Sequence, residues 1–243
     1  MKKLFMMCIG AALIAGCGGK SSELKMITEA TFPPYEFLRG QEIVGIDVEI
    51  CRAVADKLGR PFQCETVDFD SVIPAVISGK ADLAAAGITI TEDRKQNVDF
   101  SIPYVKTGIV VIYKKSNPFT DVEQLKGTKI GVQSGTTSEN YVLEELGQEP
   151  ERTRSPAEAV AGLMAGRCDF VIADIDPAKN CVKGEDELAL SDFITSEEYA
   201  VAIRKGQPEL LAAINETIAE LKENGKLDQW IAEFTAEADS LKE

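Results

Sequence analysis

The chain has 243 residues, of which 40 are acidic and 26 basic, so its formal net charge is −14 at pH 7. This charge argues against nucleic-acid binding, because phosphate-binding surfaces are basic. The chain contains no histidine, which excludes Ser-His-Asp and Cys-His catalysis and any histidine-ligated metal site. Its length suits one large domain or two small ones.

The N-terminus has the pattern of a secretory signal. Two lysines precede an apolar run, 4–13, that is too short to span a bilayer. Small residues then precede Cys17, which predicts a lipoprotein signal peptide over residues 1–16, cleavage before Cys17 and lipidation of its sulfur. Residues 17–23 would form a flexible tether. We therefore expect an extracytoplasmic protein, lipid-anchored to the membrane in the periplasm or at the cell surface.

Four cysteines remain after the signal peptide and the lipidation site are set aside. They form two pairs of equal spacing: Cys51 with Cys64, and Cys168 with Cys181. Outside the cytoplasm this favours two local disulfides, each worth about 3 kcal/mol. Three pairings are possible, and a reducing environment would leave thiols. The chain lacks the close C-x-x-C pairs of zinc sites, so we predict no metal.

The first part of the chain alternates between predicted strands and helices. Apolar spacing and glycine stops predict strands and helices in the order 26–29, 48–58, 62–67, 72–77 and 82–86, where the second and fourth are helices. Repeated βα units imply a parallel sheet whose faces are covered.

The last of these strands leads into a short helix at a candidate anion site. Thr91 is a natural N-cap for that helix. Arg94 follows in the first turn, where a cation opposes the helix dipole, so its position suggests a nearby anion. Thr89, Arg94 and the helix N–H groups together would bind a carboxylate, although a capped helix with a solvated arginine also fits.

The middle of the chain restarts the strand–helix pattern. Predicted strands at 108–113, 129–132 and 168–173 alternate with helices. A turn at 134–138, rich in small hydroxyl residues, leads into one helix and forms a second candidate anion site. Asp174 ends the last strand, and Asp176 before a proline is expected to cap the next helix. Asp174 is then left for a functional role.

A short sequence pattern occurs once in each of these two parts of the chain. Gly79-Lys80-Ala81-Asp82-Leu83 and Gly166-Arg167-Cys168-Asp169-Phe170 share a pattern of Gly, basic, any, Asp and apolar between a helix and a strand. This predicts two similar α/β lobes. Two β-rich runs, near 105–113 and 199–203, bracket the second lobe and suit a hinge with two crossings. An amphipathic helix, 209–224, and a last helix follow.

Several side chains with suitable chemistry lie at strand ends, where parallel α/β folds bind ligands. Glu29 and Asp174 each end a predicted strand, and Phe32 and Phe69 lie close to strand ends. An anion site combined with a carboxylate matches a zwitterionic amino acid, and aromatic faces suit an aliphatic or cationic side chain. The same residues also have structural interpretations: the phenylalanines as core, Glu29 as a solvated strand end and Thr137 as an N-cap.

Taken together, these residues resemble those of a known family, the periplasmic amino-acid-binding proteins of polar-amino-acid ATP-binding-cassette (ABC) importers. This family is solute-binding protein family 3. The resemblance covers essentially the whole mature chain. The motifs that carry it are ATFPPYEF at 30–37, VGIDV at 44–48, FDSVIPA at 69–75, GITITEDR at 87–94, DFS at 99–101 and GVQSGTT at 131–137, with Asp174, Gly225 and Trp230.

The resemblance implies an α/β, two-lobed, type II Venus-flytrap fold with a two-strand hinge. Lobe 1 would hold residues 24–105 together with 202–243, and lobe 2 residues 106–201. Ligand binding would close the lobes, and the closed protein would dock on an inner-membrane ABC permease. A monomer suits this opening and closing, and no cofactor or catalytic residue is implied.

The resemblance also implies which residues hold the two charges of an L-amino acid. Arg94 would clamp the α-carboxylate, helped by Thr89 and Thr137. Asp174 and the carbonyl of Gly87 would hold the α-ammonium group.

The remaining implied site residues surround the ligand side chain. Phe32 and Phe69 would flank it, and Glu29 or Gln133 would contact its tip. Glu29 stands where many relatives have Asp, Gln133 where some glutamine binders have Lys, and Ala173 where some have His. These departures favour arginine or lysine over glutamine, with glutamine and other polar amino acids left open. A periplasmic dehydratase-like enzyme, with Glu29 as general acid, and an amino-acid sensor are the alternatives of other classes.

Overall fold

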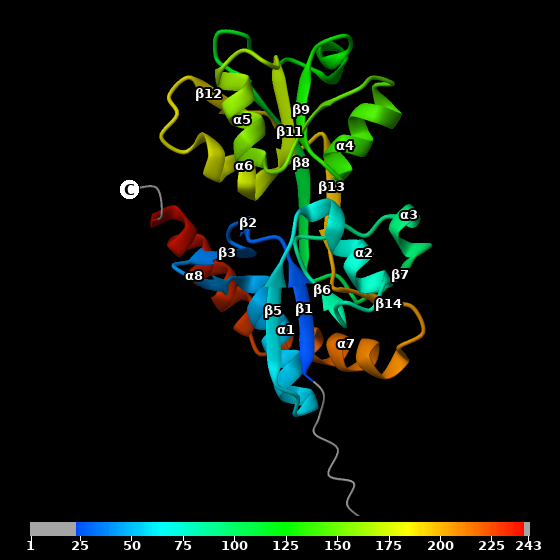
Figure 1. Ribbon diagram of the computed structural model, residues 1–243. Coiled ribbons are helices and arrows are strands. Elements are labelled where there is room, and N and C mark those ends of the chain that lie inside the picture. The colour runs from blue at the N-terminus through cyan, green and yellow to red at the C-terminus, as the bar shows by residue number, and fades with distance from the viewer. Residues whose placement is uncertain (1–22, 241–243) are drawn as a thin grey trace, which may run out of the picture.

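The computed structural model describes residues 23–240, which form two lobes stacked along the long axis of the molecule (Figure 1). Each lobe is built around its own sheet. Strand β8 runs from one lobe into the other, and the chain returns between β13 and β14. The signal peptide, Cys17 and almost all of the tether lie outside the described residues. Within residues 23–240 no helix is long and apolar enough to cross a bilayer.

The lobe that contains the N-terminal strand, lobe 1, has a five-stranded sheet in the order β5-β1-β6-β14-β7. A small three-stranded sheet, β2-β3-β4, lies beside it. The strands are β1 (Leu24–Thr28), β2 (Thr31–Phe32), β3 (Glu36–Arg39), β4 (Glu42–Val44), β5 (Phe62–Thr66), β6 (Leu83–Ala84), β7 (Val98–Phe100) and β14 (Ala202–Arg204). The helices are α1 (Ile46–Leu58), the 3-10 turn η1 (Phe69–Ser71), α2 (Val72–Ile77), α3 (Glu92–Lys95), α7 (Pro208–Glu223) and α8 (Lys226–Ser240).

Lobe 2 has a sheet in the order β10-β9-β11-β8-β12, with β13 also paired to β8. Its strands are β8 (Val105–Lys114), β9 (Ile130–Gln133), β10 (Glu151–Thr153), β11 (Phe170–Asp174), β12 (Leu188–Leu190) and β13 (Thr195–Tyr199). Its helical segments are η2 (Val122–Leu125), α4 (Thr137–Asn140), the π-helical turn η3 (Tyr141–Glu145), α5 (Pro156–Met164) and α6 (Ile175–Val182).

The sheets are mixed rather than purely parallel. β1, β5 and β6 run parallel, as predicted, but β14 pairs antiparallel with β6 and β7. In lobe 2, β8 pairs antiparallel with β11, β12 and β13. β8 and β14 are the first strands of the chain in each lobe after it crosses the hinge, so their direction is set by the crossing and not by a βα unit.

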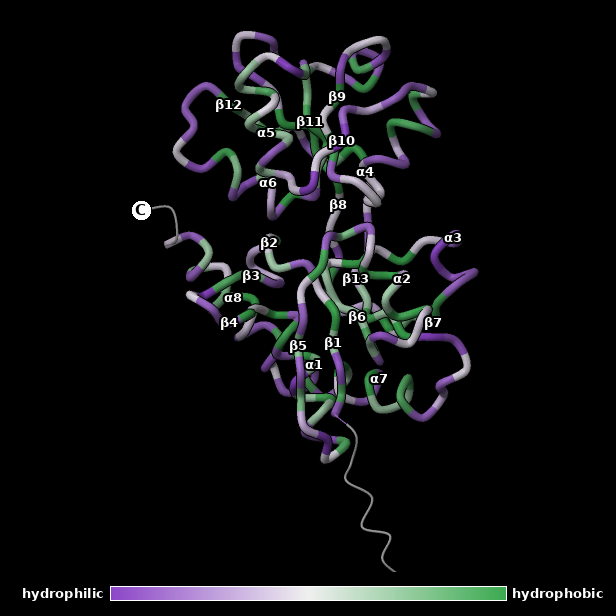
Figure 2. Tube along the Cα trace, in the orientation of Figure 1, coloured by the Kyte–Doolittle hydropathy of each residue, from purple (hydrophilic) through white to green (hydrophobic). Residues whose placement is uncertain are grey.

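Alternate side chains cover both faces of the lobe 2 sheet. Val110 and Ile112 of β8 belong to one buried cluster, and Ile109 and Val111 to another on the opposite face. Figure 2 shows hydrophobic residues concentrated along the central strands of each lobe, with hydrophilic residues in the outer loops. The period of two in β8 places helices on both faces, as the continuous apolar run predicts.

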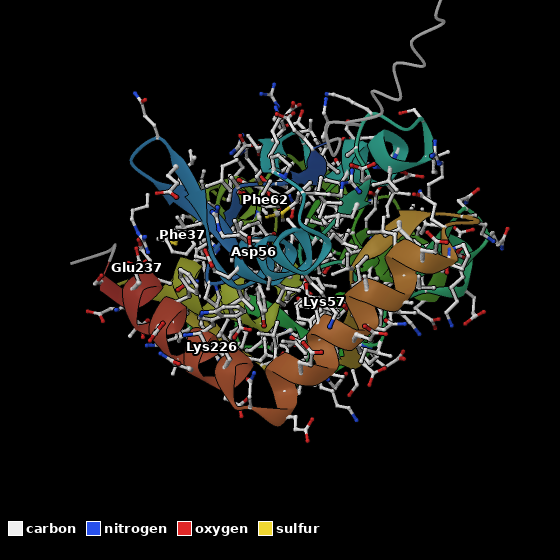
Figure 3. All side chains as sticks on the ribbon, turned by 90° about the horizontal axis from the view of Figure 1, so that it is seen from below. Phe37, Asp56, Lys57, Phe62, Lys226 and Glu237 are labelled. Atoms are coloured by element: carbon white, nitrogen blue, oxygen red, sulfur yellow. The ribbon has the colours of Figure 1, made fainter. Side chains whose placement is uncertain are left out.

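The C-terminal helices close one end of lobe 1. Seen from below in Figure 3, α7 and α8 lie across the lobe, with Lys57 of α1 next to α7. Lys57 Nζ donates to Glu220 Oε1 at 2.7 Å. Glu237 of α8, which the figure labels, pairs with Arg39 of β3.

The sequence pattern that the two lobes share has a structural counterpart. Asp82 Oδ2 accepts the backbone N–H of Lys25 at 2.9 Å, and Asp169 Oδ2 accepts that of Lys129 at 2.9 Å. In each case the aspartate N–H donates back to the carbonyl of the same lysine, at 2.9 and 2.8 Å. Both lobes therefore join two neighbouring strands with the same reciprocal contact.

The two predicted disulfides are absent from the described chain, which has thiols at Cys51, Cys64, Cys168 and Cys181. Cys51 is completely buried and Cys168 nearly so. Burial raises the pKa of the Cys51 thiol, and that of Cys64 to about 12. Thiols with raised pKa values carry little reactive thiolate, so these side chains act here as small hydrophobic residues, the alternative that their spacing left open.

Candidate functional site

A small cavity lies between the lobes and is lined by residues of both. Eight of the nine residues predicted to bind ligand line it, Glu29 being the exception, and Thr136 is an additional member. The lining residues are Phe32, Phe69, Gly87, Thr89, Arg94, Gln133, Thr136, Thr137 and Asp174. The two predicted anion sites, which are more than 40 residues apart in the chain, therefore meet at one point.

Arg94 connects the two lobes at this cavity. Thr91 caps α3 as predicted, since its side chain accepts the backbone N–H of Arg94 at 3.2 Å. The guanidinium donates from Nη1 to the Thr89 carbonyl at 2.8 Å and from Nη2 to the Gly135 carbonyl of lobe 2 at 3.0 Å. Its Cζ lies 5.6 Å from the centre of the Phe69 ring. Burial lowers the pKa of Arg94, but an arginine stays charged in proteins. The site therefore holds a fixed cation.

A carboxylate that the sequence analysis missed lies beside this cation. Glu197 of β13 is buried and accepts the hydroxyl of Thr89 at 2.5 Å. It is close enough to both Arg94 and Asp174 to affect their pKa values. The predicted strand started at residue 199, whereas β13 ends there. With the strand placed correctly, Glu197 would have shared the buried face of Tyr199.

The position of Gly87 requires glycine for two reasons. Its φ of 55° lies in the left-handed region, and a Cβ there would stand 2.6 Å from Cε1 of Phe32. The Phe32 ring thus packs directly on the Gly87 backbone. The Gly87 N–H donates to Asp47 Oδ2 at 2.9 Å, and this hydrogen bond holds the backbone at Gly87 in place.

In lobe 2 the helix that follows the hydroxyl-rich turn is capped by Thr136 and not by Thr137, which was the alternative interpretation of Thr137. Thr136 caps α4 by accepting the Glu139 N–H at 3.3 Å, and its hydroxyl donates to the Gln133 carbonyl at 2.8 Å. Thr137 has no capping role and lines the cavity. Gln133 is held by Nε2, which donates to the Arg154 carbonyl at 2.8 Å.

Asp174 is at the end of β11 with no capping bond to α6. The prediction that Asp176 caps this helix is wrong: Asp174 occupies the N-cap position, and Asp176 lies in the first turn. Asp176 instead accepts the hydroxyl of Tyr35, in lobe 1, at 2.8 Å. The Tyr199 hydroxyl donates to Asp174. Burial, followed by the nearby Glu197 carboxylate, raises the pKa of Asp174 to about 7.

Glu29 lies behind the cavity wall, directly after β1. It is buried, and its Oε1 accepts the Thr31 hydroxyl at 2.6 Å, whereas its Oε2 has no hydrogen-bond partner among the described residues. Burial raises the pKa of Glu29, and contacts with Thr31 and Gln133 oppose that shift. A buried carboxylate oxygen without a partner is unfavourable unless a donor reaches it.

The charges around the cavity are unbalanced. Arg94 supplies one guanidinium, the carboxyls of Asp174 and Glu197 lie near it, and the carboxyl of Glu29 lies behind the wall beside Gln133. With all of them ionised the surroundings carry a formal charge of −2. A zwitterion leaves this excess untouched, whereas a ligand with an additional cation reduces it. Within residues 23–240 no cluster of His, Cys, Asp and Glu is suited to a metal ion.

Comparisons with known proteins agree with this geometry. A family model for bacterial extracellular solute-binding proteins, family 3, matches residues 24–237. The arginine-binding extracellular protein of Bacillus subtilis (strain 168) is 31% identical over 94% of this chain and 96% of its own.

Two solved structures show the same fold. One is an amino acid ABC transporter substrate-binding protein from Streptococcus pneumoniae bound to L-arginine, with 33% identity, a TM-score of 0.81 and coverage of 89% of this chain and 95% of that one. Another is an ancestral arginine-binding protein bound to glutamine, with 39% identity, a TM-score of 0.80 and coverage of 88% and 97%. The chain therefore belongs to the bacterial extracellular solute-binding proteins of family 3, which are transport proteins and not enzymes.

Proposed function

We propose that this protein binds a basic L-amino acid, arginine before lysine, between its two lobes and delivers it to the permease of an ABC importer. The observation that carries this proposal is the buried Oε2 of Glu29, which has no hydrogen-bond partner among the described residues and belongs to a side chain in contact with Gln133 of the cavity wall. A guanidinium presents five N–H donors in a planar fork, so it is well suited to such an oxygen.

Both charges of the amino-acid backbone find a partner in the cavity. Arg94 would bind the α-carboxylate with the hydroxyls of Thr89 and Thr137, which all line the same space. Asp174 and the Gly87 carbonyl would hold the α-ammonium group. A ligand carboxylate at Arg94 also offers an acceptor to Thr89, which now donates to Glu197.

The side chain of the ligand accounts for the excess of carboxyls. Arginine and lysine carry a net charge of +1, which favours the ionised form of these carboxyls and offsets their charge, whereas glutamine carries no net charge. Phe32 and Phe69 supply aromatic faces for a flat or aliphatic chain. Glutamine and other polar amino acids remain the alternative, supported by the ancestral relative whose structure contains glutamine.

Ligand binding would favour the closed arrangement of the lobes. Contacts already cross between them: Arg94 to Gly135, Tyr35 to Asp176, and Asn180 Nδ2 to the Pro33 carbonyl at 2.8 Å. Each of the two ligand charges would have partners from both lobes. Only a closed protein can therefore satisfy both charges, and the ligand stabilises it by that difference in contact energy.

Export and anchoring complete the proposal. Lipidation at Cys17 would hold a monomer at the outer side of the membrane, and the tether would let it reach the permease. The family's extracellular character supports this location.

A thermal-shift screen tests the ligand. Residues 18–243, refolded to remove carried-over ligand, would be heated with each of the twenty amino acids, ornithine, citrulline and cystine. A ligand at a thousand times its Kd adds about 4 kcal/mol of stability. We expect arginine and lysine to raise Tm most. A larger shift with a neutral amino acid would support amino-acid binding between the lobes but reject a basic ligand. No shift with any of these compounds would reject the proposed function.

A further inference from the structure

Three acidic side chains lie together beneath the lobe 1 side of the cavity, and none of them lines it. Glu36 and Asp47 are 0% exposed and Tyr104 is 4% exposed. They come from three separate segments: Glu36 starts β3, Asp47 is in the first turn of α1, and Tyr104 directly precedes β8. We refer to these three residues as the buried acid cluster.

The cluster contains oxygen atoms that lack partners. Among the described residues, both carboxyl oxygens of Glu36, Oδ1 of Asp47 and the Tyr104 hydroxyl have no hydrogen-bond partner. Yet these groups face one another, since the Glu36 carboxyl and the Tyr104 hydroxyl are both close to Asp47. Two neighbouring carboxylates cannot both ionise in an apolar interior. A proton held between them turns mutual repulsion into a hydrogen bond.

Asp47 connects this cluster to the cavity. Its other oxygen, Oδ2, accepts the Gly87 N–H at 2.9 Å. Gly87 in turn contacts the Phe32 ring, because a Cβ at residue 87 would stand 2.6 Å from that ring. Phe32 pairs with Glu36 in the β2–β3 ladder. The contacts thus form a closed circuit through Glu36, Asp47, Gly87 and Phe32.

We propose that Glu36 and Asp47 form a proton-sharing carboxyl pair that positions Gly87 and Phe32, the lobe 1 walls of the cavity. Glu36 carries the proton and donates it to Asp47, and Asp47 accepts from Glu36, Tyr104 and the Gly87 N–H. Both acids are positioning residues, because neither reaches the cavity. The consequence for ligand affinity rests on the proposed function, whereas the consequence for Gly87 does not.

The protonation that this requires agrees with the burial of both groups. Burial raises the pKa of Glu36 well above its ordinary range, and the Asp47 carboxylate raises it further. Burial also raises the pKa of Asp47, to about 6, against the opposing bonds from Gly87 and Tyr104. At neutral pH the pair then holds one proton, on Glu36.

Two substitutions of Glu36 separate a proton donor from simple packing. Glu36→Gln keeps an N–H donor towards Asp47, and Glu36→Met keeps similar length without a donor. Val54→Ala is the matched control, because Val54 is also fully buried in the lobe 1 core on α1 but lies two turns beyond Asp47. Urea unfolding of each variant shows how far the fold is weakened.

The Gly87 amide resonance and the Kd for L-arginine are the two readouts. We expect Glu36→Met to shift the Gly87 N–H resonance upfield in the ligand-free protein and to raise Kd at least tenfold, on the order expected when a buried acceptor loses its donor. Glu36→Gln should keep the resonance in place and Kd within about threefold. Val54→Ala should lower stability and move neither readout.

The infrared spectrum gives an independent measure of the proton. A band from a protonated carboxylic acid is expected in the natural protein at about pH 8, where Asp174 is mostly ionised, and should weaken in Glu36→Gln. Absence of that band, an unmoved Gly87 resonance in Glu36→Met, or equal effects of both Glu36 substitutions would overturn the proposal. If the natural protein binds no amino acid, the proposed function fails, and the resonance and the band still decide the positioning role.

Discussion

The two lobes share a scaffold but differ in the chemistry that they bring to the cavity. Each uses an aspartate, Asp82 or Asp169, to join the first residues of two neighbouring strands. At the opposite ends of those strands the lobes diverge. Lobe 1 presents a guanidinium and aromatic rings, and lobe 2 presents hydroxyls and Asp174. The two lobes therefore share a scaffold contact but bring charged groups of opposite sign to the cavity.

Each specialised group also depends on the opposite lobe or on the hinge. Arg94 of lobe 1 donates to Gly135 of lobe 2, and Asp174 of lobe 2 accepts from Tyr199, the last residue of β13 at the crossing. The aromatic rings of Tyr35 and Tyr199 meet edge to face, with centroids 5.1 Å apart. Closure therefore assembles the site, because neither lobe positions its charged group alone.

The largest effect should come from removing the lobe 1 cation. Arg94→Ala leaves the ligand carboxylate in a closed cavity without its charged partner, which costs about 4 kcal/mol or more and corresponds to a loss of about a thousandfold in affinity. The fold should survive, because Arg94 is partly exposed and packs on Phe69 at the cavity edge. Isothermal titration calorimetry with L-arginine checks this.

A matched control exists within the same lobe. Arg52 lies over the Phe62 ring at 5.1 Å, a contact like that between Arg94 and Phe69, but on the surface of α1. Arg52→Ala should leave Kd unchanged within about twofold. Equal affinity of the two variants would show that Arg94 is a packing residue and not the carboxylate clamp.

The lobe 2 acid should make binding depend on pH. Asp174 has a pKa of about 7 in the folded protein, above the ordinary value of 3.8, so it is mostly protonated below neutrality and only its ionised form attracts an ammonium group. Affinity should therefore rise by about fiftyfold between about pH 5 and about pH 8, with a proton released on binding at the acid end of that range. Titrations in buffers of different ionisation enthalpy measure that proton.

The raised pKa of Asp174 gives the stability of the ligand-free protein the opposite dependence on pH. Because folding raises the pKa of Asp174, its contribution to stability is present at low pH and declines as pH rises from about 4 to about 7. Asp174→Asn should weaken arginine binding by about a hundredfold at pH 8 and flatten both pH profiles. A profile that stays steep in this variant would assign the titration to Glu29, whose pKa is also raised by burial.

A smaller effect, on ligand specificity, is expected from substitution of Glu29, which lies behind the cavity wall. Glu29→Gln removes the charge that faces the ligand tip, so arginine affinity should fall by about tenfold while glutamine affinity changes by about twofold or less. Glu65→Gln, at the exposed end of β5, is the control for the loss of one charge from lobe 1. An unchanged ratio between the two ligands would remove Glu29 from the recognition of the side chain.

Local rules were enough to predict the part of the site that depends on helix ends. Thr91 as a cap and Arg94 as a misplaced cation are visible within four residues, and the structure places both as expected. At the start of α5 the Ser155 side chain likewise accepts the Glu158 N–H at 3.3 Å, as serine commonly does at a helix N-terminus. These features need only neighbouring residues, so sequence alone specifies them.

Features that depend on distant segments were missed or misplaced. The pairing of Glu36 with Asp47 needs a strand and a helix to meet at their starts, and no period or motif in the sequence marks it. Glu197 was overlooked because the chain changes lobe after Tyr199, which divides one apolar run into β13 and β14. The cysteine spacing predicted disulfides that the described chain lacks, although each pair shares one core: Cys51 and Cys64 in lobe 1, and Cys168 and Cys181 in lobe 2.

The smallest effect tests whether the shared aspartates are equivalent. Asp169→Ala removes one backbone partner and should lower the free energy of unfolding by about 1 kcal/mol. Asp82→Ala should lower it by about 1.5 kcal/mol, because Asp82 also pairs with Arg60 at 3.0 Å and a partly exposed ion pair adds only a fraction of a kilocalorie. Urea denaturation measures both, and Kd for arginine should stay within about twofold, since both aspartates lie at the ends of the strands away from the cavity. If only Asp82→Ala weakened the protein, the reciprocal contact of lobe 2 would contribute nothing, and the likeness between the lobes would be one of shape without a common source of stability.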